Sequence, residues 1–230
     1  MIELTRIDKR FMSARNTNII VDPLLDLLKK VGAVYTNDHF VYTSGKHGSV
    51  YINKDAMYQH PGETTLICRM FAERYQDVDI DVVVGPAVGG IVLSQWTAYH
   101  LTQLKGKEVT GVFTEKDTTN NQIFTRGYDA LVKNKKILVV EDITTTGGSV
   151  KKVVASVKNA GGKVVAVVVM VNRNTKNVTT DTIGAPFSAL CTLEADAYEE
   201  KNCPLCKKKI PINMMVGHGK KYLDSKEKLA

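Results

Sequence analysis

Short runs of valine and isoleucine alternate along the chain with longer segments in which apolar residues recur at helical spacing. The short runs lack the apolar–polar alternation of a half-exposed strand, so they predict strands that are buried on both faces. We expect strands over residues 80–86, 108–116, 135–142 and 163–174. We expect helices within residues 21–34, 61–75, 89–104 and 147–161.

Regular alternation of strands and helices is typical of an α/β fold, here a central, mostly parallel sheet with helices on both faces. Ligands of such sheets bind beyond the carboxyl ends of the strands. Three unusual sequences follow predicted strands: GPAVGG at 85–90, EDITTTGGS at 141–149 and VNRN at 171–174. We therefore expect a site along their common edge. Residues 39–56, ahead of this core, are β-like around a glycine-rich turn.

The second of these sequences has the composition of a phosphate site. A strand runs into Thr144, Thr145, Thr146, Gly147, Gly148 and Ser149, and a helix follows. Backbone N–H groups at a helix N-terminus attract anions, glycines allow close approach, and hydroxyls add donors. Such a turn can also be a simple serine/threonine cap, because glycine-rich turns alone are weak indicators.

Two adjacent carboxylates, Glu141 and Asp142, stand directly before this loop. They would repel a lone phosphate, so they indicate a further partner such as sugar hydroxyls or a divalent cation. A phosphate and a ribose held side by side is the simplest interpretation. The chain has no G-x-x-x-x-G-K-[ST] sequence, and no G-x-G-x-x-G follows the first predicted core strand, which disfavours P-loop and dinucleotide sites.

The segment ILVVEDITTTGGSV, residues 137–150, resembles the phosphoribosyl-pyrophosphate (PRPP) signature of type I phosphoribosyltransferases. VVVGPAVGGIVLS is similar to the pyrophosphate loop of that family, and FVYTSGKHGSVYINKD resembles the hood of its orotate branch. The resemblance covers about residues 20–175. It implies an N-terminal helix and small hood in residues 1–60, a PRPP-binding core in 61–185, and a C-terminal appendage in 186–230.

The resemblance implies an enzyme that moves the phosphoribosyl group of PRPP onto a nitrogenous base. The threonine- and glycine-rich loop would hold the 5-phosphate. Glu141 and Asp142 would hold the ribose hydroxyls near Mg²⁺, which binds through PRPP. A mobile loop at 115–126 would close over the site with Lys116 and Arg126. The pyrophosphate would meet the backbone of the loop that follows the first core strand: Ala87, Val88, Gly89 and Gly90.

The expected base is orotate, in pyrimidine nucleotide synthesis. Arg173 matches the arginine that holds the orotate carboxylate, and Thr145 and Lys46 are further candidates for base contacts. The chain departs from the orotate pattern, because the mobile loop has no histidine and Asn172 replaces an aspartate. A purine or another base therefore stays open as the substrate. His47 and His60 are expected to be polar surface residues.

CPLC at 203–206 has the spacing of thiolate ligands. A redox role would need a strand before it and a helix after it, as in thioredoxin, and no such pattern surrounds Cys203. A structural Zn²⁺ held by Cys203 and Cys206 needs two more ligands. Cys191 and His218 are the nearest candidates in sequence, and a second subunit is the other source. Metal binding and its absence are equally compatible with a lone CxxC.

Charge changes this picture little. The net charge is +7, and the last thirty residues carry eight lysines against two acids, so most of it belongs to a solvated C-terminal end. Nucleic-acid binding is therefore disfavoured, and a non-catalytic PRPP-sensing regulator is the weaker alternative. No apolar run is long enough for a membrane and no secretory signal is evident, so we expect a cytoplasmic protein. The family resemblance implies a homodimer.

Overall fold

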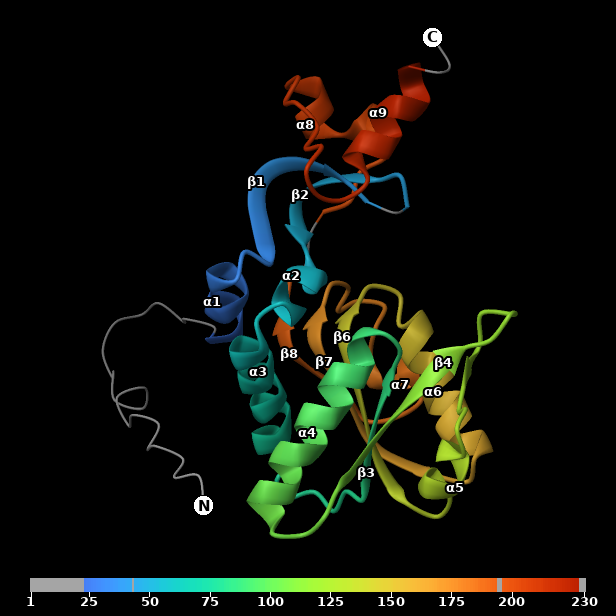
Figure 1. Ribbon diagram of the computed structural model, residues 1–230. Coiled ribbons are helices and arrows are strands. Elements are labelled where there is room, and N and C mark those ends of the chain that lie inside the picture. The colour runs from blue at the N-terminus through green and yellow to red at the C-terminus, as the bar shows by residue number, and fades with distance from the viewer. Residues whose placement is uncertain (1–22, 43, 194–195, 228–230) are drawn as a thin grey trace.

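A six-stranded sheet forms the centre of the protein in a computed structural model that describes residues 23–42, 44–193 and 196–227 (Figure 1). The strand order is β5-β4-β3-β6-β7-β8. All neighbours pair in parallel except β5, which is antiparallel to β4. The strands are β3 (Val82–Pro86), β4 (Thr110–Lys116), β5 (Gln122–Ile123), β6 (Lys136–Thr144), β7 (Lys163–Asn172) and β8 (Phe187–Thr192). The predicted α/β fold is confirmed.

Helices cover both faces of this sheet (Figure 1). On one face α1, α3 and α4 pack in a core with Leu138 and Val140 of β6, and on the other α5, α6 and α7 pack with Ile137 and Val139. Both faces of the strands are thus apolar, which explains the continuous valine runs. The helices are α1 (Pro23–Lys30), α3 (Pro61–Arg74), α4 (Gly89–Lys105), α5 (Tyr128–Val132), α6 (Gly148–Asn159) and α7 (Thr180–Ile183).

Helix ends follow local chemistry. Pro23 opens α1, where its missing N–H costs nothing, and Gly106 closes α4 with a φ of 59° that an L-residue with a side chain rarely adopts. In the described chain, none of the helices combines the length and the apolar character that crossing a membrane requires.

A separate two-stranded hairpin stands over the carboxyl edge of the sheet (Figure 1). This hood hairpin consists of β1 (Val34–Val41) and β2 (His47–Ile52), and the short helix α2 (Lys54–Tyr58) leads from it into the core. The hairpin matches the β-like segment and glycine-rich turn that the sequence predicts. The sequence does not predict α2, because its pattern continues the β-like segment that precedes it.

The C-terminal segment, residues 196–227, folds back on the hood hairpin and carries α8 (Pro204–Lys207) and α9 (Gly219–Glu227) after a 3₁₀ turn at Glu200–Asn202 (Figure 1). Its backbone pairs with both edges of the hairpin. The His47 and Tyr198 backbones exchange two hydrogen bonds of 2.8 Å, and the Asn213 N–H donates to the His39 carbonyl at 2.8 Å. The described lysines of this segment stay exposed, as expected for a solvated end.

Candidate active site

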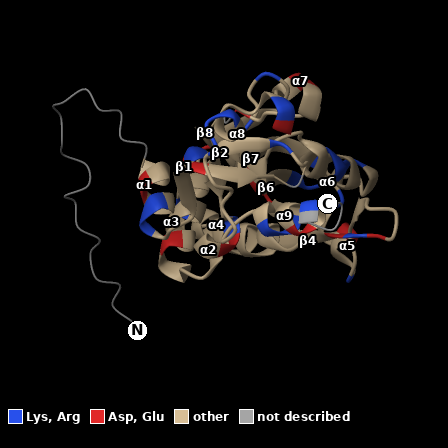
Figure 2. Ribbon diagram, turned by 90° about the horizontal axis from the view of Figure 1, so that it is seen from above, with Lys and Arg blue, Asp and Glu red and all other residues tan. Residues whose placement is uncertain are grey.

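The carboxyl ends of four strands meet beneath the hood hairpin and carry the predicted site residues. Lys116 ends β4, residues 87–90 follow β3, the acids and the threonine-rich loop end β6, and Arg173 follows β7. Strands β3 and β6 are neighbours, and their connections run to opposite sides of the sheet. This is the switch point at which doubly wound sheets bind ligands. Figure 2, seen from above, shows acidic residues of β6 near the middle of this edge.

The acid pair lies at the end of β6 and is almost completely buried. Asp142 keeps only 2% of its surface exposed. It pairs with Lys54 Nζ at 3.1 Å and accepts a 3.0 Å hydrogen bond from the Tyr58 hydroxyl. Glu141 accepts a hydrogen bond from the Asp142 backbone N–H at 3.0 Å. Lys54 and Tyr58, both on α2, are not among the site residues that the sequence predicts, although Lys54 belongs to the segment that resembles the hood.

Burial and neighbouring charge shift the pKa values of Glu141 and of two groups that contact Asp142. Burial, and then the Asp142 charge, raise the pKa of Glu141 above its ordinary value of 4.5 to about 8. Burial disfavours the Lys54 ammonium, but Asp142 outweighs it and the pKa of Lys54 is raised. Burial and Asp142 also raise the pKa of Tyr58, so its hydroxyl stays a neutral donor. At neutral pH the ligand-free site therefore holds one ion pair and a largely protonated Glu141.

The threonine-rich loop forms a turn with open hydroxyls. The Gly147 N–H donates to Thr144 Oγ1 at 3.0 Å, which buries the first threonine inside the turn. Gly147 has a φ of 74°, and a Cβ there would lie 2.8 Å from Ile183 Cδ1. Thr145, Thr146 and Ser149 remain exposed at the start of α6. The turn thus aims hydroxyls and the positive end of the α6 dipole at the same space.

A second glycine turn, at residues 87–90, contacts the acid pair. The Ala87–Val88 peptide bond is cis, and the Ala87 N–H donates to the Thr114 carbonyl at 2.7 Å. A Cβ on Gly89 would lie 2.4 Å from Asp142 Oδ2, and a Cβ on Gly90 would lie 2.7 Å from the Gly85 carbonyl carbon. Val88 is 81% exposed. Gly89 therefore allows this backbone to approach Asp142, and Gly90 allows it to pack closely against the end of β3.

The loop at 115–126 is a hairpin that β4 and β5 form. Lys116 is exposed, and it lines a cavity of about 220 Å³ together with Thr146, Gly148 and Ser149 of the threonine-rich loop. Arg126 makes a 3.3 Å ion pair with Glu115 and is not part of that lining. Of the two predicted loop cations, the structure thus brings Lys116, and not Arg126, beside the threonine-rich loop.

Arg173 lies between the end of β6 and the hood hairpin. Its backbone N–H donates to the Thr144 carbonyl at 2.9 Å, and its guanidinium lies 4.8 Å from the ring centre of Tyr42 in the hood hairpin. Its Nε is buried and has no hydrogen-bond partner within the described chain. Lys46 instead pairs with Glu199 of the C-terminal segment at 3.4 Å.

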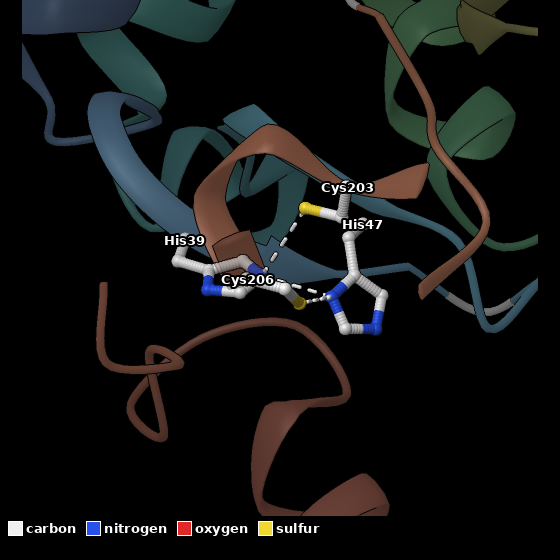
Figure 3. A group of neighbouring side chains, drawn as sticks. All are labelled: His39, His47, Cys203 and Cys206. Carbon is white, nitrogen blue, oxygen red and sulfur yellow. Dashed lines mark hydrogen bonds between the residues drawn. The ribbon is translucent and has the colours of Figure 1, made fainter. Parts of the chain in front are cut away.

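The sequence-based view of the CPLC segment needs correction. The residues that approach Cys203 and Cys206 are His39 and His47 of the hood hairpin, rather than the expected Cys191 and His218 (Figure 3). His47 is completely buried, so its expected place on the surface is wrong. The sequence contained one indication of this arrangement, because His39 and His47 lie on either side of a glycine-rich turn. His60 is exposed, as predicted.

Known proteins are similar to this chain over most of its length. The family model described as phosphoribosyl transferase domain matches residues 53–184. The orotate phosphoribosyltransferase of Caldanaerobacter subterraneus subsp. tengcongensis is 36% identical over 191 residues, which are 83% of this chain and 94% of that protein. The orotate phosphoribosyltransferase of Desulforamulus reducens is 37% identical over 190 residues, 83% of this chain and 93% of that protein.

Solved structures agree on the fold. A Mycobacterium tuberculosis orotate phosphoribosyltransferase, crystallised with inorganic phosphate, superposes with a TM-score of 0.59 at 23% identity and covers 75% of this chain and 95% of its own. A phosphoribosyltransferase from Corynebacterium diphtheriae gives 0.56 at 27% identity, covering 74% and 93%. Together with the geometry of the strand edge, these similarities mean that the chain belongs to the orotate phosphoribosyltransferases, within the phosphoribosyltransferase family.

Proposed function

We propose that this protein transfers the 5-phosphoribosyl group of PRPP to orotate, giving orotidine 5'-phosphate and pyrophosphate. The observation that carries the proposal is one strand edge that holds a buried acid pair, two glycine turns and an arginine whose Nε has no hydrogen-bond partner within the described chain. The sequence relatives that share most of the chain bear the name of this activity.

The phosphate end of PRPP binds at the start of α6. Exposed hydroxyls of Thr145, Thr146 and Ser149 donate to the 5-phosphate, and the helix dipole adds a favourable field. The backbone of residues 87–90 faces the pyrophosphate from the neighbouring strand. Lys116 reaches the charged side of the ligand from the loop hairpin. Because the 5-phosphate and the pyrophosphate are each held by one of the two glycine turns, the anomeric carbon between them lies near the acid pair.

The acid pair serves the ribose and the developing positive charge. Asp142, ionised beside Lys54, stabilises an oxocarbenium-like transition state electrostatically. Carboxylate oxygens are the ligands that Mg²⁺ prefers, so Glu141 and Asp142 fit a Mg²⁺ that arrives with PRPP. The ion would neutralise the pyrophosphate leaving group. A raised pKa of Glu141 keeps excess negative charge out of the site until the ligand enters.

Arg173 selects the base. A guanidinium binds a carboxylate with two parallel hydrogen bonds, and orotate differs from uracil by a carboxylate. Tyr42 holds the arginine through its ring face and leaves the buried Nε for such an acceptor. Thr145 borders the same space from the end of β6, and Lys46 of the hood can contribute once its pair with Glu199 opens.

The test is pyrophosphate release from PRPP and Mg²⁺ with single bases: orotate, uracil, adenine, guanine, hypoxanthine and xanthine. Turnover with orotate alone supports the proposal, and turnover only with another base refutes it. Arg173→Lys keeps the positive charge but loses the two parallel N–H donors of the guanidinium. We expect kcat/KM for orotate to fall at least about tenfold, because a tenfold loss corresponds to about one hydrogen bond to a charged group. The matched control Arg69→Lys, on the exposed face of α3, should leave kcat/KM unchanged.

We further propose a homodimer in the cytoplasm. Leu66, Trp96 and Tyr99 on α3 and α4 expose between 38% and 47% of their surface, which gives an apolar face suited to a second copy. Light scattering on the purified chain should give twice the monomer mass, and a monomer mass would refute the dimer. The four cysteines form no disulfide with one another, which suits a reducing compartment.

A further inference from the structure

Two histidines and two cysteines meet where the C-terminal segment crosses the hood hairpin (Figure 3). We define His39, His47, Cys203 and Cys206 as the His/Cys cluster. One nitrogen of each histidine and the sulfur of each cysteine all lie within 4.8 Å of one another. The residues come from opposite ends of the chain, and nothing in the proposed transfer reaction uses them. Their convergence therefore needs an explanation of its own.

The separations suit a single metal ion. Cys206 Sγ lies 3.3 Å from His47 Nδ1 and 3.7 Å from His39 Nε2, and Cys203 Sγ lies 3.7 Å from the same His39 nitrogen. Tetrahedral zinc bonds of about 2.1 Å to nitrogen and 2.3 Å to sulfur place such ligands about 3.6 Å apart. The two nitrogens are 2.8 Å apart, and two nitrogen ligands of tetrahedral zinc lie about 3.4 Å apart, so the imidazoles would separate by about 0.6 Å on binding the ion.

Hydrogen bonding fixes the direction of the lone pairs. His39 Nδ1 lies 2.8 Å from the Ile210 carbonyl, which can only accept, so that nitrogen carries the proton. His39 Nε2 then presents a lone pair to the cluster, in the arrangement that a backbone carbonyl gives to metal-bound histidines. Without a cation, His47 would have to donate from Nδ1, and its buried Nε2 would be an acceptor without a donor within the described chain.

A metal removes that conflict. His47 can then carry its proton on Nε2 and offer Nδ1 as a ligand, and its ring meets the Tyr222 ring edge to face with the ring centres 5.1 Å apart. His39, His47 and Cys203 are each no more than 1% exposed, so water cannot satisfy these groups instead. Thiolate and imidazole ligands in a closed four-coordinate set favour zinc over magnesium or calcium. Two thiolates also balance the charge of a divalent ion.

We propose that the His/Cys cluster binds one structural Zn²⁺ that fastens the C-terminal segment to the hood hairpin. Both histidines flank the turn of the hairpin, and the cysteines supply the other half of the site. The turn carries Tyr42, on which Arg173 rests. The ion therefore holds the hood in the place from which it supports the base-binding arginine. This last link rests on the proposed function, whereas the metal site does not.

The first measurement is the metal content of the full-length chain, purified without chelators or a histidine tag and dialysed against a small excess of Zn²⁺, then against buffer. We expect one zinc per chain by mass spectrometry, and none in Cys206→Ser or His47→Gln. Cys191→Ser and His218→Gln change the same residue types outside the cluster and should keep the ion. A zinc-free native protein, or equal loss in the control variants, would overturn the proposal.

A variant that fails to fold would also lose metal, so the ligand set is read on the native protein. X-ray absorption at the zinc edge should show two sulfur and two nitrogen neighbours, and a shell of light atoms alone would refute the site. Far-UV circular dichroism accompanies each variant to identify unfolded ones. Cobalt in place of zinc should give the intense visible bands of a tetrahedral thiolate site, independently of any activity.

The role in the hood is tested separately. Stripping zinc from the native protein should speed amide hydrogen exchange in residues 196–218 and raise KM for orotate more than KM for PRPP. Unchanged exchange after zinc removal would refute the fastening role. A protein that keeps zinc but turns over no orotate would refute the proposed function and leave the metal site intact.

Discussion

Replacing Glu141 with glutamine should make the protein more stable at high pH and leave it nearly unchanged at low pH. The buried carboxyl has a folded-state pKa of about 8, raised from 4.5 by burial and by Asp142. A raised pKa means that the folded chain holds a proton that the unfolded chain releases. The stability that this proton provides is complete below pH 4.5 and is lost as the pH rises through 8.

The magnitude follows from the size of the shift. Each pKa unit corresponds to about 1.4 kcal/mol, so the ionisable carboxyl lowers the free energy of unfolding by about 3 kcal/mol at pH 7 and about 5 kcal/mol above pH 9. Glutamine has the same shape, can still accept from the Asp142 N–H and does not titrate. The free energy of unfolding of Glu141→Gln minus that of the native protein should therefore grow by about 3 kcal/mol between pH 5 and pH 8.

Urea unfolding of the ligand-free protein, followed by circular dichroism at half-unit steps of pH, measures this difference. Glu108→Gln, at an exposed glutamate, is the matched control and should shift the free energy by less than about 0.5 kcal/mol at any pH. A difference between Glu141→Gln and native protein that stays flat from pH 5 to pH 8 would show that Glu141 ionises freely, and would refute this account of the acid pair.

The two glycine turns give further predictions. Gly147→Ala forces a side chain into a φ of 74° against Ile183 and should lower Tm by about 2–8 °C. Gly148→Ala has room for its side chain and should change Tm by less than about 2 °C. Equal shifts of the two variants in calorimetry would contradict this. Gly89→Ala places a Cβ 2.4 Å from Asp142 Oδ2 and should reduce kcat/KM for PRPP at least about tenfold. The same clash should lower the free energy of unfolding by about 1–3 kcal/mol. Native kinetics in this variant would show that the backbone at Gly89 can move away from the acids.

Local patterns predicted the core well because each strand there is buried on both faces. Val167 and Val169 face one layer of helices while Val168 and Met170 face the other, so the run carries a clear strand signal. The strand Phe187–Thr192 was missed because most of it is only partly buried at the edge of the sheet, and its sequence is short and mixed. Its assignment depends on pairing with β7, which sequence periodicity does not contain.

The site divides in the same way. The acid pair and the threonine-rich loop are contiguous along the chain, so the order of their residue types is enough to indicate their chemistry. The contact between His39 and Cys203 spans 164 positions, and the residue types alone gave no means of choosing His39 over Cys191 as a partner. Lys54 and Tyr58 were missed for a related reason, since only the fold of α2 brings them to Asp142.

The return of the C-terminal segment to the hood hairpin also orders events during synthesis. The core strands through β7 are complete once residue 172 has left the ribosome, so the sheet and its phosphate turns can assemble early. The hairpin has been made long before, but its backbone partners Tyr198 and Asn213 are still to come. The C-terminal segment therefore joins the hood hairpin last. A chain that terminates a few dozen residues early would keep its sheet and glycine turns but would lose part of the segment that supports the hairpin.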